Sequence, residues 1–228
     1  VTVRDDAEAT ANFLAGTLAG SSGRLRNDAL IAIAARPELP PLLDAGRLQP
    51  LSLWLREPRQ PVAERAQVLV QLARVGAPGI VDLAEGLTAA DGSLQAAAVD
   101  ALISIDKVPP AERLLVWTRS SDEALRLAAS RGLAKIASPA ALDRLAEMLA
   151  HDTSAGVRLA IVQALARVPG EQAVTLLAGE LAKSDKTLAV AAAESLGRLA
   201  SPQAIAALGV ALEQGSSDAQ AAAAFALK

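Results

Sequence analysis

The sequence predicts an all-α fold, a right-handed superhelix of about seven stacked helix pairs, on three observations. The 228 residues include 53 Ala and 36 Leu, whereas aromatic residues make up only 2%. Such small and aliphatic side chains suit close-packed helices and not sheets. The chain also repeats itself, and the apolar residues of each repeat follow the spacing of one helical face.

Six segments align without gaps, and most of them follow one another at a period of 30 to 32 residues. They are 23–36, 63–75, 93–105, 124–136, 156–168 and 187–199, with a seventh at 218–227. Small or apolar residues recur at offsets 0, 4, 7, 8 and 11, which in one segment are Val157, Ile161, Ala164, Leu165 and Val168. This spacing predicts a helix with one buried face, and we call these segments the B helices.

A second helical pattern precedes each B helix, and we call these segments the A helices. Pro78, Pro139 and Pro202 open three of them, as suits a first helical turn in which the N–H has no partner. Asp or Ser residues follow, including Asp91, Asp122, Asp152, Asp185 and Ser216, and favour turns and N-caps. Stacked pairs bury their apolar faces in one core, with the B helices expected on the concave side.

We expect a single array over residues 1–228, part of a chain that continues beyond both ends. One spacing of 39 residues marks a Pro-rich insertion at about 37–61, which we expect to be irregular because prolines limit helix length. Trp54 within it either fills a gap in the stack or forms an exposed binding anchor.

The composition excludes several chemistries. Without cysteine there is no disulfide, thiolate metal site or cysteine nucleophile, and one histidine excludes multi-histidine sites. We therefore expect no catalytic residue, no metal and no cofactor. The net charge of −3 argues against nucleic-acid binding. No apolar run reaches the 18 or so residues of a membrane span, so we expect no membrane insertion. The 17 Arg against 5 Lys suggest a GC-rich coding sequence, and we therefore expect a bacterial protein. Its compartment, cytoplasmic or exported, stays open.

The segment 152–168 resembles a HEAT repeat. The resemblance rests on Asp152, Val157-Arg158, Ile161, Ala164-Leu165 and Val168, and the period is similar to the short bacterial class first noted in phycobilisome-lyase subunits. Leu25-Arg26 and Leu125-Arg126 repeat the apolar-Arg pair, Glu64 replaces its apolar residue before Arg65, and Gln95, Ala189 and Gln220 depart from the Arg. The resemblance implies an array that binds other macromolecules. It also implies that Arg26, Arg65, Arg126 and Arg158 bond Asp residues such as Asp122 and Asp152.

Basic residues recur at offset 10 of the B helices, at Arg74, Lys135, Arg167 and Arg198, and Arg131 lies at offset 6. The repeat would align them into a ridge on the concave rim that holds acidic side chains, a peptide carboxylate or phosphate. Alternatively, they stabilise the C-terminal ends of their helices. His151 precedes Asp152 in a predicted turn, and we expect it to be solvated.

The leading hypothesis is a non-enzymatic scaffold that binds a protein partner, with an acidic surface if the ridge is the site. One alternative is an accessory subunit of an enzyme, lyase-like, with a tetrapyrrole or another small ligand. Another is a purely structural spacer. The Ala-rich pattern ends at Lys228 without a polar cap, so self-association through this end is also expected.

Overall fold

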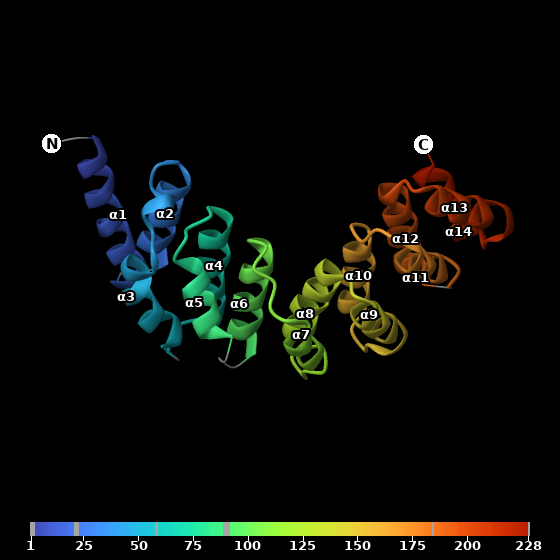
Figure 1. Ribbon diagram of the computed structural model, residues 1–228, viewed down its shortest axis with the longest axis horizontal. Coiled ribbons are helices and arrows are strands. Elements are labelled where there is room, and N and C mark those ends of the chain that lie inside the picture. Colours follow the sequence, from blue (N-terminus) through green and yellow to red (C-terminus); the bar gives the residue numbers. More distant parts are fainter. Residues whose placement is uncertain (1–2, 21–22, 58, 89–91, 184, 228) are drawn as a thin grey trace. The chain divides into compact units, whose positions relative to one another are not determined.

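The computed structural model describes residues 3–20, 23–57, 59–88, 92–183 and 185–227, and their regular structure is helical (Figure 1). The chain divides into two compact units, Val1–Pro109 and Pro110–Lys228, at a Pro-Pro pair. Both units are built of A and B helices in alternation, which confirms the predicted all-α fold of HEAT-like helix pairs. An uninterrupted array across both units stays a prediction.

The first unit has A helices α1, α3 and α5 and B helices α2, α4 and α6. The A helices pack on one another in order, and so do the B helices, which gives two layers. The bounds are α1 Val3–Gly20, α2 Gly23–Ala34, a 3-10 helix Pro40–Leu42, α3 Ala45–Arg56, α4 Val62–Arg74, α5 Ile80–Leu87 and α6 Gly92–Ser104. Leucine and alanine fill the core between the layers, where Leu18, Leu51, Leu69 and Leu87 are fully buried.

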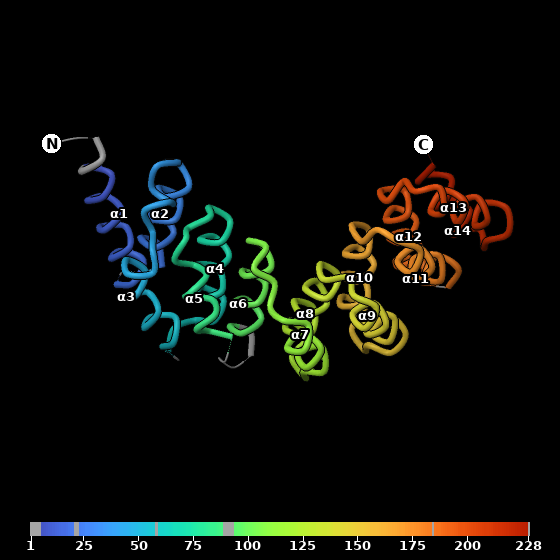
Figure 2. Tube along the Cα trace, in the orientation of Figure 1, coloured from blue at the N-terminus to red at the C-terminus, as the bar shows by residue number. Residues whose placement is uncertain are grey.

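The second unit repeats this plan with A helices α7, α9, α11 and α13 and B helices α8, α10, α12 and α14. The Cα trace in Figure 2 follows this alternation from α7 to α14. The bounds are α7 Ala111–Trp117, α8 Glu123–Ile136, α9 Pro139–His151, α10 Ala155–Leu165, α11 Glu171–Leu181, α12 Lys186–Leu199, α13 Pro202–Gln214 and α14 Ser217–Ala226. None of the helices in the described ranges combines the length and the apolar character that crossing a bilayer needs.

The predicted helix starts are largely those of the structure. Ser138 and Ser201 accept a hydrogen bond from the third helical N–H, and Pro139 and Pro202 take the first helical position. Asp122, Asp185 and Ser216 cap α8, α12 and α14 in the same way. Two predicted starts differ, because Ser154 and not Asp152 caps α10, and α5 begins at Ile80 rather than at Pro78. Asp91 lies outside the described residues.

The structure differs from the sequence prediction inside the Pro-rich insertion, because residues 45–56 form the regular helix α3. Asp44 caps α3 by accepting a hydrogen bond from the Arg47 N–H at 2.9 Å, and Pro50 lies inside the helix. The extra length of this repeat lies in residues 35–44, which join α2 to α3, whereas only residues 137 and 138 join α8 to α9. The helix survives its proline because its apolar face, with Leu48 and Leu51, is buried.

The lengthened turn docks on the start of α5 through backbone atoms. The Gly79 N–H donates to the Leu43 carbonyl at 2.9 Å, and a Cβ at Gly79 would lie 2.5 Å from the carbonyl carbon and oxygen of Asp44. Since those atoms belong to the backbone, the turn would have to move as a whole to make room.

We therefore expect Gly79→Ala to lower the free energy of unfolding by about 1–3 kcal/mol, the usual cost of overpacking. Urea denaturation followed by circular dichroism measures the change. Gly209→Ala is the matched control, because Gly209 lies in α13 with open space around it. There the better helix propensity should stabilise the protein by about 0.5–1 kcal/mol. Equal stability of Gly79→Ala and wild type would contradict the close approach.

Candidate functional site

A donor near the start of most B helices closes the A helix that precedes it. The last carbonyls of a helix lack intrahelical partners and carry the negative end of the helix dipole, so a cationic or amide donor stabilises them. Four donors bond carbonyls at the end of an A helix, Arg26 to Leu18 O at 3.2 Å, Arg65 to Leu55 O at 2.9 Å, Gln95 to Thr88 O at 2.5 Å and Arg158 to Asp152 O at 2.5 Å. Arg126 donates at 3.1 Å to Ser120 O, which lies in the turn after α7. Gln95, which departs from the repeat pattern, therefore keeps the same role with an amide.

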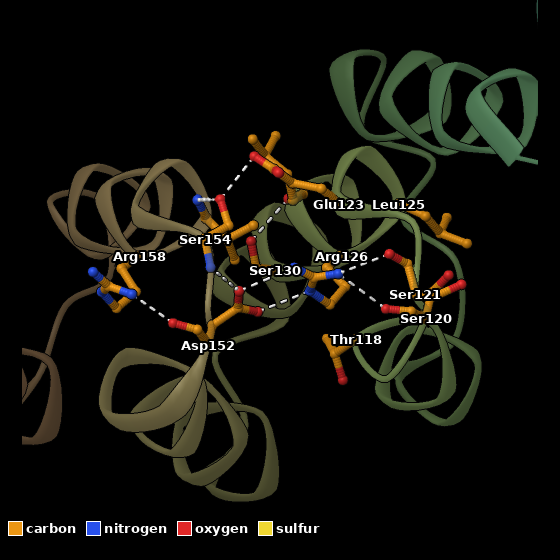
Figure 3. A network of polar contacts seen from close by, with 12 residues as sticks. Thr118, Ser120, Ser121, Glu123, Leu125, Arg126, Ser130, Asp152, Ser154 and Arg158 are labelled. Atoms are coloured by element: carbon orange, nitrogen blue, oxygen red, sulfur yellow. Dashed lines mark hydrogen bonds and ion pairs between the residues drawn. The ribbon is translucent and has the colours of Figure 1, made fainter.

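Arg126 has a second role, because it also binds the next repeat. Its Nε and Nη2 donate to the two carboxylate oxygens of Asp152 at 2.9 and 3.1 Å, and Figure 3 shows Asp152 between Arg126 and Arg158. This confirms the expected Arg–Asp bond between neighbouring repeats. Arg26, Arg65 and Arg158 instead donate to backbone carbonyls, and Arg26 also lies 3.6 Å from the Glu64 carboxylate.

The electrostatics of this pair favour its ionised form. Burial by itself would raise the pKa of Asp152, but hydrogen bonds from Arg126 and from the Ser154 N–H, with the charges of Arg126 and Arg158, outweigh burial and lower it. The hydrogen bond to Asp152 likewise raises the pKa of Arg126. The pair is thus a structural clamp between the first turn of α8 and the turn before α10.

The predicted basic residues are exposed and lie near the ends of B helices. Lys135 is in the last turn of α8, Arg167 follows α10 and Arg198 is in the last turn of α12. Since α8 packs on α10 and α10 on α12, the repeat places these three along one edge of the second unit, which we call the cation edge. Arg131 is exposed one turn earlier on α8, and Arg74 ends α4 in the first unit.

Trp54 lies in α3 and is only 8% exposed. The guanidinium carbon of Arg26 stands 3.9 Å from the centre of its ring, and the Arg26 side chain is itself buried. A cation stacked on a desolvated indole face is a favourable contact. This placement supports the gap-filling alternative for Trp54 over the exposed anchor.

A hollow of about 320 Å³ opens in the second unit beside the Arg126–Asp152 pair. It lies between the C-terminal ends of α7 and α9 and the first turn of α8, at the opposite end of α8 from the cation edge. Its lining is Thr118, Arg119, Ser120, Arg126, Arg144, Glu147, Met148, His151, Asp152 and Thr153. His151 is the last residue of α9 and not part of a turn, so the predicted solvated histidine is exposed but lines this hollow.

Arg144 is a second cation of the hollow that is held on several sides. Its Nε donates to the Thr118 hydroxyl at 3.0 Å and its Nη2 to the Thr118 carbonyl at 3.2 Å, and Thr118 is almost fully buried. Its Nη1 forms an ion pair with Glu147, whose side chain is 59% exposed. The hydrogen bond and charge of Arg144, with smaller effects of Arg119 and His151, lower the pKa of Glu147.

Sequence reasoning missed this hollow because its residues come from separate elements. Thr118 and Arg144 are 26 residues apart, and no fixed spacing links them to Arg126. Only the packing of α7 against α8 and α9 brings them together. In the described ranges, no group of three or more His, Asp or Glu side chains could hold a metal ion.

Comparison with known proteins supports the fold. A crystal structure of an engineered protein matches with a TM-score of 0.53 and 21% identity, covering 98% of this chain and 73% of that one. Human deoxyhypusine hydroxylase in complex with glycerol matches with a TM-score of 0.43 and 19% identity, covering 98% of this chain and 96% of that one. A search of curated proteins finds no match. The model of HEAT repeats matches residues 80–166, 111–189 and 148–228, and the chain therefore belongs to the HEAT-repeat family.

Proposed function

We propose that the chain is a non-enzymatic scaffold module that holds a protein partner with an acidic surface. The observation that carries the proposal is the cation edge. HEAT repeats commonly mediate protein–protein interaction, and here successive B helices of the second unit end in exposed cations Lys135, Arg167 and Arg198. A periodic row of positive charge is suited to an extended acidic segment, because complementary charge raises association rates and fixes register.

The buried arginines of both units are occupied by contacts within the protein, so the exposed cations of the cation edge are the groups that a partner can reach. Arg26, Arg65 and Arg158 donate to backbone carbonyls, and Arg126 to Asp152, so these groups serve to hold the stack. The competing explanation for the cation edge is that its charges stabilise helix C-termini, each by about 0.3–1 kcal/mol. That explanation predicts a loss of stability on substitution but no loss of a partner.

The test is affinity capture from a lysate of the source organism with three baits. One is the wild-type chain and one carries Lys135→Glu, Arg167→Glu and Arg198→Glu. The third is a control of equal charge change, with exposed cations of the first unit replaced as Arg24→Glu, Arg36→Glu and Arg59→Glu.

We expect wild type and control to hold a common partner and the cation-edge variant to lose at least about 90% of it, because three attractive charge contacts become repulsive. Equal capture by the cation-edge variant would overturn the site. Catalytic turnover by the isolated chain, abolished by changing one polar residue, would overturn the non-enzymatic assignment.

A further inference from the structure

We propose that the hollow between α7, α8 and α9 is a binding site for a carboxylate side chain, an Asp or Glu of a protein partner. The hollow brings three guanidiniums, those of Arg119, Arg126 and Arg144, against two carboxylates, those of Glu147 and Asp152. Its net charge is therefore +1 with a neutral histidine. This inference rests on the proposed protein-binding function and names a recognition group that the cation edge does not supply.

The groups of the hollow divide into a closed inner pair and an outer cation. Arg126 and Asp152 satisfy each other through two hydrogen bonds, and the Nη1 of Arg126 donates to the carbonyls of Ser120 and Ser121, so neither side chain offers a position to a ligand. Arg144 differs, because Thr118 holds its Nε and Nη2 and leaves Nη1 directed to Glu147. Its guanidinium is thereby fixed before any ligand arrives, and preorganisation reduces the cost of binding.

Glu147 shows what kind of group this outer position takes. It already places a carboxylate on Arg144 Nη1, and it does so from an exposed side chain on the same helix, three residues along. Exposed ion pairs of this kind contribute little to stability, so an incoming carboxylate can replace Glu147 at small cost. Planar guanidinium and carboxylate groups also match in geometry, which a single ammonium would not provide.

Two further side chains, those of Arg119 and His151, line the hollow without a partner of their own among the described residues. In the described part of the chain, neither the Arg119 guanidinium nor the His151 imidazole makes a hydrogen bond or ion pair, and both line the hollow. Both side chains also help to lower the pKa of Glu147. An acidic side chain that displaces Glu147 from Arg144 would lie near the same two side chains. The carboxylate of Glu147 that already lies on Arg144 is the observation that favours a carboxylate over a phosphate dianion.

His151 offers a direct reporter, because it is the only histidine of the chain. The experiment follows its imidazole resonances by NMR while N-acetyl-Gly-Glu-Gly-amide is added to the full chain. The Gln counterpart of this peptide, free glutarate and inorganic phosphate are added in parallel. We expect saturable shifts with the Glu peptide and no shift with the Gln peptide. Glutarate separates a free dicarboxylate from a peptide side chain as the source of the group.

Substitutions then test the exchange of carboxylates. Glu147→Gln removes the internal competitor and should tighten peptide binding about three- to tenfold, whereas Arg119→Gln should weaken it about threefold, as expected for single charge contacts. Arg144→Gln should abolish binding, with circular dichroism as the check that the variant folds. The matched control is Arg36→Gln in the first unit, an exposed arginine that does not line the hollow, which has the same charge change and should leave binding unaltered.

The proposal is overturned if Glu147→Gln does not tighten binding, if the Gln peptide shifts His151 as much, or if phosphate or glutarate binds more tightly than the Glu peptide. The two proposals fail separately. Loss of the carboxylate site with partner capture intact would leave the scaffold function standing. Peptide binding without any captured partner would remove the scaffold function alone.

Discussion

Replacement of Trp54 by alanine is expected to lower the free energy of unfolding by about 3–5 kcal/mol, the range for buried aromatic side chains. The indole is only 8% exposed, and its removal also leaves the buried Arg26 guanidinium without the ring on which it stacks. Arg26 Nε already lacks a hydrogen-bond partner in the structure, so the loss would leave a poorly solvated charge in a cavity. Urea denaturation followed by circular dichroism measures the change.

The neighbouring residue provides the control. Leu53 lies on the same helix but is 73% exposed, so Leu53→Ala should change the stability by less than about 0.5 kcal/mol. If Trp54→Ala were as mild as Leu53→Ala, the tryptophan could not be a core residue, and a role as an exposed anchor would have to be considered again.

Replacement of Asp152 by alanine is expected to cost about 2–4 kcal/mol, because it leaves the guanidinium of Arg126 largely buried without its counter-charge. The same change removes the acceptor of the Ser154 N–H. Asp143→Ala on α9 is the matched control, since Asp143 is exposed and accepts one hydrogen bond, from Gln172. A measured loss for Asp152→Ala no greater than that of Asp143→Ala would contradict the role of the clamp.

The clamp also makes the stability of the protein depend on pH. The pKa of Asp152 is lower in the folded chain than its ordinary value of 3.8, so the unfolded chain takes up its proton first as the pH falls. The contribution of Asp152 is therefore fully present above the unfolded pKa of 3.8 and is lost as the pH falls through the lower, folded value. In acid titrations of stability, the difference between wild type and Asp152→Ala should shrink below about pH 4.

Much of the fold followed from the repeat. The apolar positions of 157–168 recur along the chain, and Ser138-Pro139 and Ser201-Pro202 mark helix starts by chemistry that acts within a few residues. Helix α3 was not predicted from the sequence, because Pro50 and the prolines around it argue against a helix. The burial of residues such as Leu51 explains why a helix forms there. Tertiary packing outweighs local propensity there.

Some contacts of the candidate site could be predicted from the sequence and others could not. The Arg126–Asp152 bond was expected, because it belongs to a pattern that the family repeats. The partners of Arg26 and Arg65 were not, because their acceptors are backbone carbonyls, which every residue carries and no sequence pattern marks. The hollow could not be predicted either, since its key contact, Arg144 with Thr118, depends on how two A helices approach each other.

The donors that close the A helices have a consequence for how such a protein can change its length over evolution. Each donor lies only 6 to 10 residues after its carbonyl acceptor, within one A–B pair. A duplication or deletion of one genetic unit of repeat length carries both halves of this contact together. New copies would thus arrive with these contacts already in place, and selection would need to adjust only the surfaces between repeats, including polar contacts such as Arg126–Asp152.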